Sequence, residues 1–179
     1  KAFDVKFSDK NNKLDFVWAT SWGVSTRLIG GLVMAHSDDD GLILPPKIAP
    51  VQVVIVPIFK SIEEKALIDE KVNALVHQLK ANNIRVKYDD NDNARPGWKF
   101  AEYEMKGVPV RIAIGARDLA NHVVEIARRD TKEKQSVSLD GLDIYIQNLL
   151  ETVQQNMFNK AKAYRDEHCT NADTWEDFV

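Results

Sequence analysis

The sequence has almost no cysteine: Cys169 is the single one among 179 residues. One thiol forms neither an internal disulfide nor a zinc site built from several cysteines, which excludes a disulfide-stabilised secreted domain. The sequence also lacks any apolar run near the roughly 20 residues that cross a bilayer. Its start, Lys1-Ala2-Phe3-Asp4, lacks the pattern of a signal peptide. We therefore expect a cytoplasmic protein without a membrane partner and, because no methionine opens the sequence, a piece of a longer chain.

A large excess of one charge is absent as well. The chain has 24 Lys and Arg against 27 Asp and Glu, a formal net charge of -3 at pH 7. This balance excludes a broadly basic coat, so any contact with nucleic acid has to come from a local basic cluster. What the sequence does have is apolar content: 44% of its residues are hydrophobic, which is enough for a sizeable core.

The first 50 residues predict a hairpin and one helix. Apolar and polar residues alternate in 3–7 and 14–18, as in two paired strands. Ser25 is a suitable N-cap for a helix from Thr26 to about His36, whose apolar face would be Leu28, Ile29, Leu32 and Val33. Gly30 and Gly31 inside this helix cost about 1 kcal/mol each. We expect close packing against another backbone to compensate. Residues 37–41 are predicted to be a turn.

From Val51 on, the pattern is that of an α/β domain. The β-branched run 51–58 predicts a strand buried on both faces, and Ser61 begins a helix over 62–82 with capping-box spacing to Glu64. Its expected apolar face is Ala66, Leu67, Val72, Leu75, Val76 and Leu79. Further strands are predicted at 84–88, 108–114, 123–128 and 136–139, with helices over 98–106 and 142–168. This order predicts the α/β fold class, with a mixed β-sheet flanked by helices.

A first chemical motif lies at residues 21–27, Ser-Trp-Gly-Val-Ser-Thr-Arg. Here a glycine-containing segment leads into a helix that begins with Arg27. The unpaired N–H groups of a helix N-terminus and a guanidinium both suit an anionic ligand such as phosphate. On spacing alone, a surface arginine beside a helix cap is the more frequent explanation.

Taken together, residues 20–30, 36–42 and 44–54 resemble prolyl-tRNA synthetase. The similarity is to the third signature motif of class II synthetases and to the link that follows it, in the archaeal and eukaryotic-like form without an editing insertion. The resemblance implies that Ser25 and Arg27 bind ATP, with Arg27 at the phosphates. It also implies that Ser21, Trp22 and Gly23 lie near the prolyl pocket.

A second motif comprises residues 95–104, 107–111 and 115–119, which are similar to the anticodon-binding domain of the same family. By this resemblance Glu104, Arg111, Arg117 and Lys132 correspond to the residues that contact the anticodon guanines. The loop after Leu119 is shorter than in the family. The chemistry is consistent, because Arg and Lys donate to guanine acceptors and a glutamate accepts from guanine N–H groups.

The resemblance divides the chain into three parts. Residues 1–49 would end a class II catalytic domain, 50–150 would form the anticodon-binding domain, and 151–179 would form a helix and the start of a C-terminal extension. The full-length protein would be a homodimeric proline-tRNA ligase that takes ATP with Mg²⁺, proline and tRNA(Pro). The fragment, with no cofactor of its own and inactive alone, would mainly recognise the anticodon. The alternative is a stand-alone RNA- or protein-binding module without catalysis, which would not need Arg27 and its flanking residues.

Three other patterns in the sequence have possible chemical meanings. Asp38-Asp39-Asp40-Gly41 is similar to the start of a calcium loop, but apolar residues replace the next oxygen ligands and no glutamate closes the loop, so we expect no metal site. Trp98 and Phe100 are candidates for base stacking, although aromatic residues at this spacing more often belong to a core. A doubly wound nucleotide-binding domain would need a glycine-rich loop after 51–58, which the sequence lacks.

Overall fold

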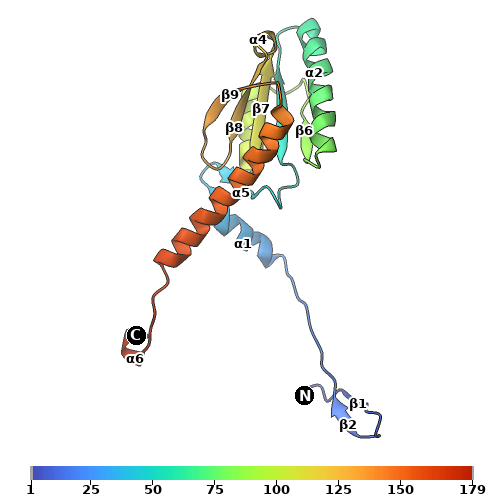
Figure 1. Ribbon diagram of the computed structural model, residues 1–179, viewed down its shortest axis with the longest axis vertical. Coiled ribbons are helices and arrows are strands. Elements are labelled where there is room, and N and C mark those ends of the chain that lie inside the picture. Colours follow the sequence, from blue (N-terminus) through green and yellow to red (C-terminus); the bar gives the residue numbers. More distant parts are fainter. Residues whose placement is uncertain (1, 179) are drawn as a thin grey trace. The chain divides into compact units, whose positions relative to one another are not determined.

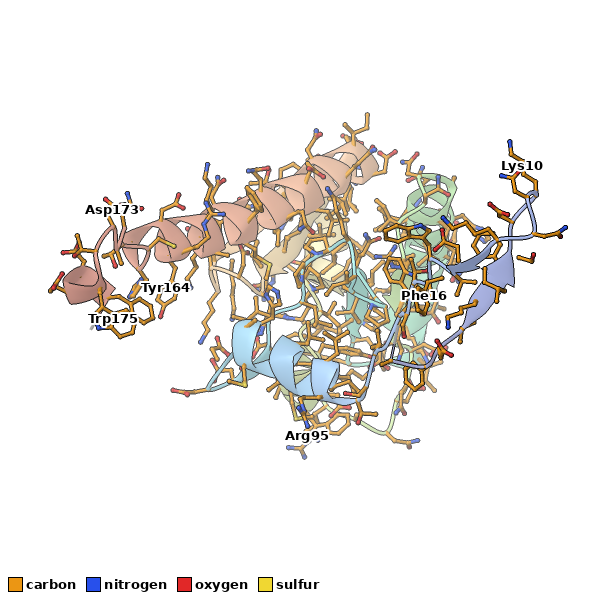
Figure 2. All side chains as sticks on the ribbon, turned by 90° about the horizontal axis from the view of Figure 1, so that it is seen from below. Lys10, Phe16, Arg95, Tyr164, Asp173 and Trp175 are labelled. Carbon is orange, nitrogen blue, oxygen red and sulfur yellow. The ribbon has the colours of Figure 1, made fainter. Side chains whose placement is uncertain are left out.

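The computed structural model describes residues 2–178 and divides the chain into two compact units, one ending at Leu32 and the other beginning at Val33. In the first unit β1 (Lys6–Ser8) and β2 (Leu14–Phe16) pair antiparallel, with Lys6 opposite Phe16. The Asp9 carboxylate closes their turn, since it accepts hydrogen bonds of 2.8 Å from the N–H groups of Asn11 and Lys13. The predicted hairpin is confirmed, and Figure 2 shows Lys10 at its tip.

The helix α1 (Arg27–Ala35) forms where it was predicted, but its apolar face is not covered. Leu28, Ile29 and Val33 are exposed. A Cβ atom added at Gly30 or Gly31 would meet no atom of the described residues within 4 Å. The close packing expected at these glycines is therefore not made within the described part of this chain.

The second unit is built on a mixed sheet (Figure 1). Its strands are β5 (Val53–Ile58), β6 (Val86–Tyr88), β7 (Val110–Gly115), β8 (Val123–Arg128) and β9 (Lys134–Ser138). They lie in the order β6-β5-β7-β8-β9; β5 runs parallel to β6 and β7, and β8 runs antiparallel to β7 and β9. The predicted α/β class with a mixed sheet is confirmed.

Two long helices cover one face of this sheet. They are α2 (Ile62–Ala81) and α5 (Leu142–Glu167), and Figure 1 shows α5 crossing the sheet. Alternate residues of the strands, such as Ile55, Ile112 and Ile126, pack against Ile68 and Ile146 of the helices. The predicted apolar face of α2 was partly wrong, because Ile68 is buried whereas Leu67 is 63% exposed. In the first turns of α2 the side chains that face the sheet lie one residue later than predicted.

The opposite face carries the helix α3 (Pro96–Met105). It starts two residues before the prediction because proline fits the first helical position, where no N–H is needed. Tyr103 of α3 packs with Val54 and Val56 of β5. Toward the sheet edge this face is open: Glu125 on β8 and Lys134 and Ser136 on β9 are exposed.

Three short elements were not predicted. Residues 37–42 form the hairpin of β3 (Ser37–Asp38) and β4 (Gly41–Leu42), where a plain turn was expected. The helix α4 (Ala116–Ala120) follows β7, and α6 (Trp175–Phe178) lies near the C-terminus, where Figure 2 labels Trp175. Such short elements depend on tertiary contacts more than on periodicity. None of the helices in residues 2–178 is long and apolar enough to cross a membrane.

Candidate functional site

A small pocket of about 100 Å³ opens on the face of the sheet that carries α3. The end of α3, the start of β7, the turn between β8 and β9 and the β3–β4 hairpin surround it. Its lining is dominated by charged side chains, among them Asp40, Glu104, Arg111, Arg129, Lys132 and Lys134. The strand register explains part of this gathering: Arg111, Ala127 and Lys134 lie opposite one another on β7, β8 and β9, so their side chains point to one face.

Arg111 is the floor of the pocket. It is 5% exposed, and its guanidinium carbon lies 3.6 Å from the centroid of the Phe100 ring, a cation–π contact. Its Nη1 atom is 3.7 Å from the Glu125 carboxylate, too far for a hydrogen bond. Within the described residues, Nε and Nη1 of Arg111 are buried without any hydrogen-bond acceptor. Burial lowers the pKa of Arg111, and the charges of Glu125 and Glu104 only partly oppose this shift.

Arg129 is equally buried, but its hydrogen bonds are satisfied. Its guanidinium binds both oxygens of Asp38, with Nη1 donating to Oδ2 at 2.9 Å. It also donates to the carbonyl oxygens of Glu104 at 3.1 Å and Gly41 at 3.2 Å. The Arg129 hydrogen bonds are the main reason why the pKa of Asp38 is well below its usual range. Arg129 thus joins the β3–β4 hairpin to the end of α3.

Lys132 lies in the β8–β9 turn with a positive φ of 61°. Its ammonium forms a close ion pair with Asp40 and a second one with Asp38 at 3.3 Å. The hydrogen bond to Asp40, followed by that to Asp38, raises the pKa of Lys132. Both members of the Lys132–Asp40 pair keep more than half of their side-chain surface exposed, at 59% and 55%.

Glu104 lies in the last turn of α3, and its side chain is exposed at the pocket. Its carboxylate makes no ion pair or hydrogen bond with any of residues 2–178, so it is available to a ligand. The helix itself is anchored at Asp89, whose carboxylate accepts a hydrogen bond of 2.9 Å from the Tyr103 hydroxyl and whose backbone oxygen accepts one of 2.8 Å from Lys99. Burial and the Asp89 carboxylate raise the pKa of Tyr103 to about 12, which keeps this hydroxyl a donor.

Chemically, the pocket offers buried donors of a guanidinium, a further ammonium and one unpaired carboxylate. This set matches the edges of an exposed nucleic-acid base, which presents both acceptors and N–H donors. Residues 52–149, which include most of this lining, match the family described as anticodon binding domain. The chain belongs to this anticodon-binding domain family.

The relatives of this anticodon-binding domain are longer proteins. The chain is 61% identical over 178 residues to a proline–tRNA ligase of Parabacteroides distasonis. It is 59% identical to one of Bacteroides fragilis and 57% identical to one of Cytophaga hutchinsonii. In each case the match covers 99% of this chain and 36% of the relative, so the chain spans about a third of the length of these proteins.

The structure of the anticodon-binding domain brings together three of the four residues predicted for the anticodon. Glu104, Arg111 and Lys132 line one pocket. Arg117 does not: it is exposed on α4, beyond the far end of β7. Since a strand rises about 3.3 Å per residue, the end of β7 at Gly115 lies roughly 13 Å from Arg111, and Arg117 follows in α4.

Other residues of the pocket were not recognised in the sequence. From the sequence we assign Asp38 and Asp40 to a turn without a binding role and make no prediction for Arg129. Arg129 and Asp38 are 91 residues apart in the chain, so no local pattern links them. Phe100 was considered for base stacking, but its ring faces the guanidinium of Arg111 instead.

The residues predicted for ATP and proline lie in the other unit. Ser21, Trp22, Gly23, Ser25 and Arg27 are all exposed there, Trp22 to 94%. The Ser25 hydroxyl accepts a long hydrogen bond of 3.4 Å from the Arg27 N–H, so it helps to close the first turn of α1. The Arg27 guanidinium makes no ion pair with the described residues.

Proposed function

We propose that this chain is the anticodon-recognising part of a proline-tRNA ligase, and that its pocket reads the anticodon guanines of tRNA(Pro). The observation that supports this most directly is Arg111, a buried guanidinium whose Nε and Nη1 have no acceptor among the described residues. A buried unpaired donor is costly to a protein, by about 1 to 3 kcal/mol. A ligand that brings an acceptor removes this cost, and O6 and N7 of guanine are spaced for an arginine fork.

The neighbouring groups give the pocket its selectivity. Glu104 presents a carboxylate without an ion-pair partner in the described chain, which suits the N–H groups on the Watson–Crick edge of guanine. Lys132 lines the same pocket and adds an ammonium donor. Arg117 would meet a different part of the RNA, because it lies beyond the far end of β7.

For the longer protein, we propose activation of proline with ATP and transfer of the prolyl group to tRNA(Pro). Arg27 would bind the ATP phosphates, Ser25 would line the ATP site, and Ser21, Trp22 and Gly23 would lie at the proline pocket. Mg²⁺ would enter with ATP as part of the substrate, and the enzyme would act as a cytoplasmic homodimer. The present chain alone would lack the activity, since it spans 36% of such ligases. A stand-alone module is not favoured, because the similarity covers 99% of the chain and includes residues 20–30.

The anticodon proposal is tested by RNA binding. The 179-residue chain is titrated with the anticodon stem-loop of tRNA(Pro) and with a stem-loop whose two anticodon guanines are replaced. We expect Arg111→Ala to weaken binding of the first RNA by about 1 to 3 kcal/mol and that of the second RNA much less.

Arg165→Ala is the matched control. It removes the same charge from the exposed C-terminal part of α5, outside residues 52–149, where Arg165 pairs only with its neighbour Asp166 among the described residues. Equal losses of Arg111→Ala on both RNAs would identify Arg111 as a general phosphate contact and contradict the proposal. Equal binding of both RNAs by the unchanged chain would also contradict the proposal.

A further inference from the structure

The β3–β4 hairpin forms one wall of the pocket although it lies outside the matched residues 52–149. It is locked to the end of α3 at two glycines. Gly41, with φ of 131°, leaves no room for a Cβ atom, which would lie 2.4 Å from the Met105 Cα. Gly107, with φ of 70°, faces Leu42 in the same way, at 2.6 Å from its Cβ. The carboxylates of the hairpin are therefore held at a set position beside the pocket.

These carboxylates change what Lys132 can do. An ammonium has three donors, and Asp40 and Asp38 both contact that of Lys132, so few of its donors remain for a ligand. The charges also balance locally, because Lys132 and Arg129 face Asp38 and Asp40. The ammonium of Lys132 thus presents an N–H donor whose own charge is offset by the two carboxylates that it contacts.

This distinction matters for RNA. An unpaired lysine binds phosphates through its charge, which adds affinity for any sequence and makes binding depend on salt. A phosphate that approaches Lys132 also meets the negative charges of Asp40 and Asp38, which offset the attraction of the ammonium and repel the phosphate oxygens at close range. A neutral acceptor such as a base oxygen or ring nitrogen is not repelled in this way.

We propose that Asp40 is a specificity-determining residue of the anticodon site: its ion pair with Lys132 makes this lysine a donor to base edges and an unfavourable partner for phosphate. The inference rests on the proposed anticodon recognition. Asp38 supports the same pair, but it also holds the buried Arg129. Asp40 has no such second role among the described residues, so it is the residue to change.

The adjacent Asp39 provides a matched control. It is exposed, and it makes no hydrogen bond or ion pair with residues 2–178. Asp39→Asn and Asp40→Asn thus remove the same charge one residue apart, and only the second releases Lys132. Because the Lys132–Asp40 pair is exposed, both variants should unfold at the same temperature as the unchanged chain.

The experiment measures binding of the 179-residue chain to the two stem-loops described above, over a series of salt concentrations. Asp40→Asn is expected to bind the guanine-replaced RNA about threefold to tenfold more tightly, and to steepen the salt dependence of log K by about one phosphate contact. The preference for the proline anticodon falls accordingly. Asp39→Asn keeps the preference and the salt slope of the unchanged chain, and adding Lys132→Met to Asp40→Asn restores the shallow slope.

Two outcomes would overturn the inference. If Asp39→Asn had the same effect as Asp40→Asn, general charge would explain both results. If Asp40→Asn weakened binding of the proline stem-loop and left the replaced RNA unchanged, Asp40 would merely hold Lys132 in place. Failure of the proposed function is seen separately, because it shows in the unchanged chain as equal binding of the two RNAs.

Discussion

The pocket contains two arginines, Arg129 and Arg111, that are buried to the same degree but differ in their hydrogen bonds. Arg129, which follows β8, donates hydrogen bonds to Asp38 and to two carbonyl oxygens, and each of these bonds ties separate segments of the chain together. Arg111, on β7, packs on the Phe100 ring, and two of its nitrogens lack hydrogen-bond acceptors in the described chain. Satisfied donors stabilise the fold, while unsatisfied ones cost stability and are free for a ligand. The difference separates a structural cation from a binding cation within one pocket.

Removing the acceptor of Arg129 should have the largest effect. Asp38→Asn takes the charged partner from a guanidinium that stays buried, and breaking such a pair costs about 3 kcal/mol. We expect the free energy of unfolding, measured by urea titration, to fall by about this amount. Asp39→Asn is again the control and should leave it unchanged. A loss as small as that of an exposed pair would mean that Arg129 does not hold the hairpin.

Protonation of Asp38 at low pH should reproduce part of the stability loss caused by Asp38→Asn. The Arg129 hydrogen bonds lower the pKa of Asp38 below its ordinary 3.8, so the pair stabilises the fold fully above that pH. Its contribution is lost as the pH falls from 3.8 toward the lower pKa of the folded state. The gap in unfolding free energy between the unchanged chain and Asp38→Asn should therefore narrow as the pH decreases from about 5 to about 2. A gap that stays constant over this range would contradict an ionised Asp38.

The smallest change in stability is expected for the other arginine. Arg111→Met replaces a buried cation that lacks a hydrogen-bond acceptor, and whose Glu125 partner is half-exposed at 3.7 Å, by an apolar side chain of similar length that can still pack on Phe100. Such replacements are neutral or stabilising. We therefore expect the free energy of unfolding, measured by urea titration, to stay the same or rise by up to about 1 kcal/mol. Binding of the proline stem-loop should nevertheless weaken by about 1 to 3 kcal/mol, as for Arg111→Ala. A loss of stability as large as that of Asp38→Asn would contradict the distinction between Arg129 as a structural cation and Arg111 as a binding cation.

Much of the fold could be predicted from local patterns. The β-branched run before Ile58 gave a strand buried on both faces, and Ser61 and Glu64 gave the start of α2, where the Ser61 hydroxyl accepts the Glu64 N–H. The predictions were weaker where packing outweighs periodicity. Leu67 was expected in the core and is exposed, and residues 37–42 form a hairpin because Gly41 and Leu42 fit against Met105 and Gly107.

The candidate site divides in the same way. Glu104, Arg111 and Lys132 were predicted from a family resemblance with which their chemistry agrees, and the structure places them in one pocket. Arg117 was grouped with them but lies beyond the far end of β7, because the extended strand continues from Arg111 to Gly115 and Arg117 belongs to the following helix α4. Asp38, Asp40 and Arg129 were missed, since their pairing joins parts of the chain that are about 90 residues apart.

By itself the sequence determined the class of fold, the main helices and strands and the residue types available for recognising a base, because periodicity, capping and side-chain chemistry are local properties. Only the tertiary structure decided which of two equally buried arginines is paired and which is left open, and that Asp40 reaches Lys132. Those outcomes depend on the register of β7 against β8 and on the docking of a distant hairpin. No short stretch of sequence contains the energies of contacts between segments so far apart.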